Sequence, residues 1–65
     1  MWIVIHMAEG SAAAERARAC LEAEGVLVRV RPVYRKPASE ENSFEIQVLQ
    51  SEAEEARAIL LERGQ

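Results

Sequence analysis

Apolar and polar residues alternate at every second position in two stretches of this chain, residues 26–31 and 44–49. A period of two is typical of a β-strand that buries one face. Residues 2–7 are apolar except for His6 and predict a further strand. The side chains expected to face the core from the two alternating strands are Val26, Val28, Val30, Phe44, Ile46 and Val48.

Two other stretches have the composition of helices. Residues 12–24 consist mostly of Ala, Glu, Arg and Leu, with Ser11 placed to cap their start and Gly25 placed for a left-handed residue at their end. Ser51 opens a capping box, and the helix behind it should run to about Arg63. The core-facing side chains expected on the two helices are Ala13, Ala17, Cys20, Leu21, Ala56, Ile59 and Leu60.

The resulting order, βαββα, predicts one α+β domain over residues 1–65. We expect a ferredoxin-like half-sheet of three antiparallel strands with two helices on one face. Short connections and right-handed crossovers place the strand 44–49 between the other two. The segment Lys36–Ser43 reads as a polar connection, and whether it has a function of its own stays open.

Two helices can cover only one face of such a sheet, so the opposite face is the candidate interaction surface. On the first strand two parities are open, one with Met7 outward and one with His6 outward. We prefer His6 outward, together with Trp2 and Val4, because this groups the single imidazole with the other polar side chains. The candidate interaction face then consists of Trp2, Val4, His6, Arg29, Arg31, Glu45 and Gln47.

These residues also have plainer structural interpretations. Arg29 and Arg31 opposite Glu45 would form cross-strand ion pairs, which contribute little when exposed. Trp2 would be a partial lid on the core. His6 would be structural, because no nucleophile or ligand partner for it is evident in the sequence.

A chain of 65 residues is near the lower limit for folding without a disulfide, a metal or a partner. One cysteine, Cys20, and one histidine allow neither an internal disulfide nor a four-ligand zinc site. Self-association is the remaining way to bury more surface. The single thiol, with no signal peptide and no apolar span, predicts a cytoplasmic protein without a membrane segment.

The formal net charge of −3 disfavours a nucleic-acid backbone as partner. Glycine-rich phosphate loops, catalytic serine motifs, metal-binding motifs and paired cysteines are absent from the sequence. No pattern places a buried acid beside a base. We therefore expect neither an enzyme nor a cofactor.

Three places in the chain together resemble one family. They are residues 2–6, the helix-to-strand turn 21–26, and residues 44–48 leading into 54–60. They are similar to the prokaryotic signal-transducing proteins, small bacterial domains of unknown function, over nearly the whole chain. The resemblance implies a PII-like, ferredoxin-type half-sheet and a regulatory role, and it supplies no catalytic residue. The basic stretch 29–36 departs from the family pattern.

We therefore expect a small, non-catalytic regulatory or protein-interaction module. A homodimer would form through the edge of the first strand or through the open sheet face. That edge is apolar from Trp2 to Ile5 and has no Pro or Lys to prevent pairing. The alternative is a small-ligand sensor of PII or ACT type. An RNA-contacting domain that uses the arginine-bearing strand is less favoured.

Overall fold

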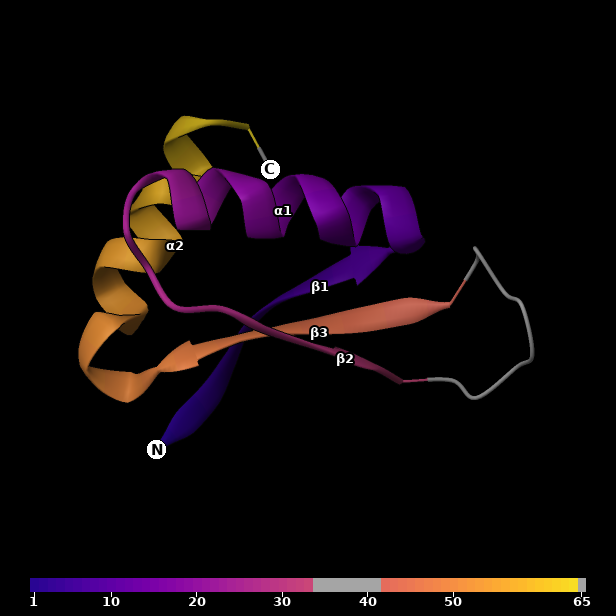
Figure 1. Ribbon diagram of the computed structural model, residues 1–65, viewed down its shortest axis with the longest axis horizontal. Coiled ribbons are helices and arrows are strands. Elements are labelled where there is room, and N and C mark those ends of the chain that lie inside the picture. The colour runs from indigo at the N-terminus through magenta and orange to yellow at the C-terminus, as the bar shows by residue number, and fades with distance from the viewer. Residues whose placement is uncertain (34–41, 65) are drawn as a thin grey trace.

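The structure, a computed structural model, describes residues 1–33 and 42–64 (Figure 1). Its elements are β1 Trp2–Glu9, α1 Ser11–Ala23, β2 Arg29–Pro32, β3 Ser43–Leu49, a 3-10 turn Gln50–Glu52 and α2 Ala53–Glu62. The strand order is β1-β3-β2, and β3 is antiparallel to both neighbours. The α+β class and the central place of β3 are therefore confirmed. Most of the Lys36–Ser43 connection lies outside the described residues.

Both helices lie on the same side of the sheet, and no helix of residues 1–33 and 42–64 covers the opposite face (Figure 1). The core lies between these layers, and its largest fully buried side chains are Leu21, Ile46 and Val48. Burying a side chain of this size contributes about 1.5–3 kcal/mol. Val28 and Val30 are partly buried against the same core. The predicted inward parity of β2 and β3 is thus correct.

Helix α1 ends in a way that shortens the following strand. Gly25 has φ 84°, as predicted for a left-handed residue, and its N–H donates to the Glu22 carbonyl at 3.0 Å. The Val26 N–H donates to the Leu21 carbonyl at 3.1 Å, and both of these side chains are buried. Because Val26 anchors the helix end, β2 begins only at Arg29, three residues later than the alternation predicts.

Both capping predictions are wrong. Gly10 occupies the position before α1 with φ 93° and ψ 155°, a backbone region open essentially to glycine alone. Ser11 is therefore the first helical residue and not the cap. Ser51 falls within the 3-10 turn, so α2 starts at Ala53 without a side-chain cap.

Strand β1 pairs with β3 along its length, but the register shifts between Val4 and His6. Residues opposite each other in an antiparallel pair share a face. His6 lies opposite Ile46, whose side chain is in the core, whereas Met7 lies opposite Glu45. The prediction that His6 belongs to the uncovered face is therefore wrong, and Met7 takes that face instead.

The physical reason is a β-bulge that accommodates Ile5 as an extra residue. A bulge sets two residues of one strand against one of its neighbour, so alternation restarts with the opposite parity. As a result the polar residue His6 is half-buried, while its apolar neighbour Met7 is 45% exposed. This is the reverse of the usual preference of these two side chains.

Candidate functional site

The outer edge of β1 offers unpaired backbone groups. Gln50 donates its N–H to the Met1 carbonyl at 2.8 Å, which fixes the hydrogen-bonding phase of the β1–β3 ladder. Bonded and non-bonded pairs alternate along such a ladder, so the N–H and C=O groups of Trp2 and Val4 point away from β3. No strand of the described residues pairs with this side of β1.

Exposed apolar side chains flank this edge on both sides of the sheet. On the uncovered face, Val4 is 42% exposed beside Met7. On the helix-covered side, Leu61 of α2 is 83% exposed. An edge with free backbone groups and apolar neighbours is a template for another extended chain.

The side chains of Trp2 and Arg29 form a lid over part of the uncovered face. The guanidinium carbon of Arg29 lies 4.7 Å from the centroid of the Trp2 ring. These residues stand on β1 and β2, about 10 Å apart with β3 between them, so their contact crosses the surface of β3. Gln47 lies opposite both Val4 and Arg29 and is only 6% exposed. Its amide donates to the Glu45 carboxylate at 2.8 Å.

This arrangement revises two structural interpretations. Trp2 covers the open face of the sheet rather than the core beneath the helices. Arg31 lies opposite Glu45 in register, but the ion pairs found among the described residues join side chains of the helices and their ends. The expected ion pairs of Arg29 and Arg31 with Glu45 are therefore not formed.

The structure brings six of the seven predicted candidates together on the uncovered face. They are Trp2, Val4, Arg29, Arg31, Glu45 and Gln47. His6 stands apart from them on the other side of β1. The use of this face in binding stays a prediction.

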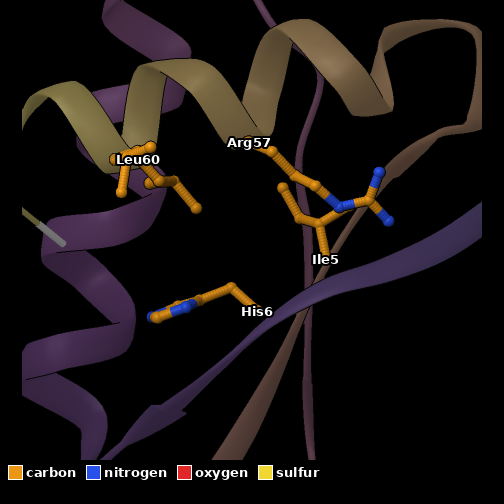
Figure 2. A pocket seen from close by; sticks show the side chains of 5 residues that line it. Ile5, His6, Arg57 and Leu60 are labelled. Atoms are coloured by element: carbon orange, nitrogen blue, oxygen red, sulfur yellow. The ribbon is translucent and has the colours of Figure 1, made fainter.

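A shallow, open hollow of about 270 Å³ lies between β1 and α2, and we call it the β1–α2 groove. Its lining consists of Ile5 and His6 from β1 and of Arg57, Leu60 and Leu61 from α2. Figure 2 shows Ile5 pointing from β1 toward α2 with Arg57 passing beside it, while the His6 ring points to the opposite side from the Arg57 guanidinium. The bulge is what brings two consecutive β1 residues to the same groove.

The groove combines two nitrogen donors with an aliphatic floor. Arg57 is exposed, and neither it nor His6 takes part in a side-chain hydrogen bond or ion pair found among the described residues. Arg16 and Arg31 likewise have no such partner among the described residues, whereas Arg18 pairs with Glu15 and Arg29 stacks on Trp2. The two donors of the groove are therefore available to a bound group.

Sequence reasoning missed the groove. Arg57 is one of eight basic residues and has no distinguishing spacing, and the bulge that turns His6 inward leaves no mark in an apolar run. In residues 1–33 and 42–64 no group of three His, Cys, Asp or Glu side chains is placed to hold a metal ion. No helix in those ranges is long and apolar enough to cross a membrane.

Comparison with protein-family models, with curated proteins and with solved structures gives no match to this chain. Function must therefore be inferred from the geometry of the chain itself.

Proposed function

We propose that this chain is a non-catalytic interaction module that associates through the free edge of β1, with a second copy of itself as the partner. The observation that carries the proposal is the pair of outward-facing peptide groups at Trp2 and Val4, beside the exposed side chains of Val4 and Met7. Backbone groups in this array are satisfied best by another extended strand.

A second copy supplies a strand of the required kind. Two β1 strands related by a two-fold axis would pair antiparallel and join two three-stranded sheets into one. The exposed side chains of Val4 and Met7 would then be covered on one face and Leu61 on the other. Because the bulge at Ile5 interrupts the edge, pairing should begin in the segment before it.

A regulatory role in the cytoplasm accompanies this proposal. The free thiol of Cys20 is half-buried against the core and suits a reducing compartment. Membership of the prokaryotic signal-transducing protein family stays a prediction that rests on the sequence resemblance.

Light scattering at several protein concentrations tests the dimer. We expect a dimer mass for wild type and a monomer mass for Val4→Lys, because a lysine at the edge opposes pairing. Leu27→Lys is the matched control, since Leu27 is 62% exposed but lies in the α1–β2 connection, and it should leave the dimer intact. A monomer mass for wild type at every concentration would end the proposal. A dimer unaffected by Val4→Lys would move the interface away from β1.

A small-ligand sensor is the second candidate function, and the β1–α2 groove is the observation that favours it. The RNA-contacting alternative has less support, because the guanidinium of Arg29 is already stacked on Trp2. Arg31, the other arginine of β2, has no cation–π contact with an aromatic ring among the described residues.

A further inference from the structure

The hydrogen-bonding phase of β1 distinguishes between the registers in which a second copy of the strand can pair with it. Before the bulge, the N–H and C=O groups that face outward belong to Trp2 and Val4. A two-fold axis beside Ile3 sets Trp2 of each copy against Val4 of the other, so every outward group of this segment is bonded. An axis at Trp2 or at Val4 leaves the other residue unbonded in this segment. The phase therefore favours the axis at Ile3.

This register brings Met1 of one copy beside the β1–α2 groove of the other. Counted from the axis at Ile3, Met1 lies opposite Ile5 of the second copy. By alternation Met1 shares the helix-covered side of the sheet with Ile3, and Ile5 lines the groove on that side. The Met1 carbonyl accepts the Gln50 N–H, which holds Met1 in line with the strand. Within a single copy Met1 is 84% exposed, so its side chain is free to be buried by a partner.

The groove suits an apolar side chain better than a free ligand. Its volume of about 270 Å³ is below the range of about 300–1,000 Å³ that is usual for ligand sites, and it is open to solvent. The aliphatic residues of its lining are Ile5, Leu60 and Leu61, and Leu61 is 83% exposed. Methionine is unbranched and flexible, so it fills irregular apolar spaces of this kind.

Charge complementarity favours the same arrangement. Arg57 lines the groove, is exposed and has no ion-pair partner among the described residues. In the second copy, Met1 is bonded to Gln50, where the turn into α2 begins. The first turn of that helix carries Glu54 and Glu55. The register therefore brings an acidic helix start toward Arg57, and the two-fold axis repeats the contact.

We propose that Met1 of a second copy occupies the β1–α2 groove, in a dimer whose two-fold axis passes beside Ile3. Each groove is completed by the other copy, and Arg57 faces the acidic start of that copy's α2. A specific interface buries about 1,200 Å² or more, and these contacts add to the short stretch of paired backbone. The inference rests on the proposed dimer and specifies its register. It also excludes a small ligand from the groove of the dimer.

Cysteine cross-linking with oxidised glutathione tests the register, in a Cys20→Ala background that removes the natural thiol. The two Ile3 residues meet at the axis as a non-hydrogen-bonded pair, with Cα atoms about 4.5 Å apart, which a disulfide can bridge. Ile3→Cys should therefore form a covalent dimer. Val4→Cys is the matched control, because the two Val4 residues are diagonal neighbours about 7–8 Å apart, too far for a disulfide.

An isotope-filtered NOE experiment on the wild-type dimer tests the occupant of the groove. Isotope-labelled copies are mixed with unlabelled copies, so that only contacts between the two copies are observed. We expect a cross-peak between the ε-methyl of Met1 in one copy and the δ1-methyl of Ile5 in the other. No cross-peak is expected between Met1 and Leu27, which is exposed in the α1–β2 connection.

The outcomes separate this inference from the dimer itself. A monomer mass for wild type would end the proposed dimer and the inference together. A wild-type dimer in which Ile3→Cys does not cross-link, or Val4→Cys does so equally well, would keep the dimer but overturn its register. A dimer without the cross-peak between Met1 and Ile5 would overturn the occupant of the groove. This last result comes from wild type, so it does not depend on the folding of a variant.

Discussion

The two edges of this sheet are built differently. The β2 edge spans four residues, Arg29–Pro32, and carries two arginines. Val33 donates its N–H to the Ser43 carbonyl at 2.8 Å, so ladder alternation turns the Pro32 position outward, where proline has no N–H to offer. A short strand with charged side chains and an outward proline is a poor template for pairing.

The β1 edge is less protected, with a bulge at Ile5 and one charged side chain, Glu9, at its end. It spans eight residues, Trp2–Glu9, without a proline, lysine or arginine, and its peptide groups at Trp2 and Val4 face outward. The same three-stranded sheet therefore closes one edge and leaves the other accessible. This difference is the reason for proposing the dimer on the β1 side of the molecule.

The largest expected effect on stability comes from β3, the strand between the two edge strands. Ile46→Ala on β3 removes a fully buried side chain and should lower the free energy of unfolding by about 2–5 kcal/mol. Leu61→Ala, at an 83% exposed position, should change it by less than about 0.5 kcal/mol. Urea denaturation at one protein concentration measures both. A cost below about 1 kcal/mol for Ile46→Ala would contradict the placement of the core.

A swap of the two side chains that follow the bulge, His6 and Met7, tests whether their placement is required for stability. The double variant His6→Met with Met7→His restores an apolar residue to the covered face and should raise the free energy of unfolding by about 1 kcal/mol. Urea denaturation of the double variant and of wild type measures this change. A loss of stability would show that His6 is held there for structural reasons.

The smallest expected effect on stability comes from the contact between Trp2 of β1 and Arg29 of β2, which crosses β3. A double-mutant cycle of Trp2→Leu and Arg29→Gln should give a coupling energy of about 0.5–1 kcal/mol, as expected for an exposed cation–π pair. The cycle of Trp2→Leu with Arg31→Gln is the control and should give no coupling. Equal coupling in both cycles would mean that Trp2 responds to general charge and not to the stacked guanidinium.

Much of the fold follows from periodicity. Alternation identifies the inward side chains of β3 and β2, because a slip by one residue would expose Ile46 and Val48. The helical spacing of Ala56, Ile59 and Leu60 on α2 is equally decisive, and all three are buried. Strong apolar periodicity on a single face leaves little freedom in how these elements pack.

The candidate site could not be predicted in the same way. From Val4 to Met7 the β1 sequence is apolar except for His6, and a single polar residue in such a run does not reveal a bulge. The contact between Trp2 and Arg29 spans two strand spacings, and a linear pattern cannot show it. Both features arise from tertiary contacts.

Amide hydrogen exchange at low and high protein concentration tests the difference between the edges most directly. The Val4 amide faces outward on β1, and ladder alternation from Pro32 places the Val30 amide outward on β2 in the same way. We predict that exchange at Val4 slows as concentration rises, because a second β1 strand protects it, while exchange at Val30 stays constant. Concentration-independent exchange at Val4, or slowing at Val30 instead, would contradict the account.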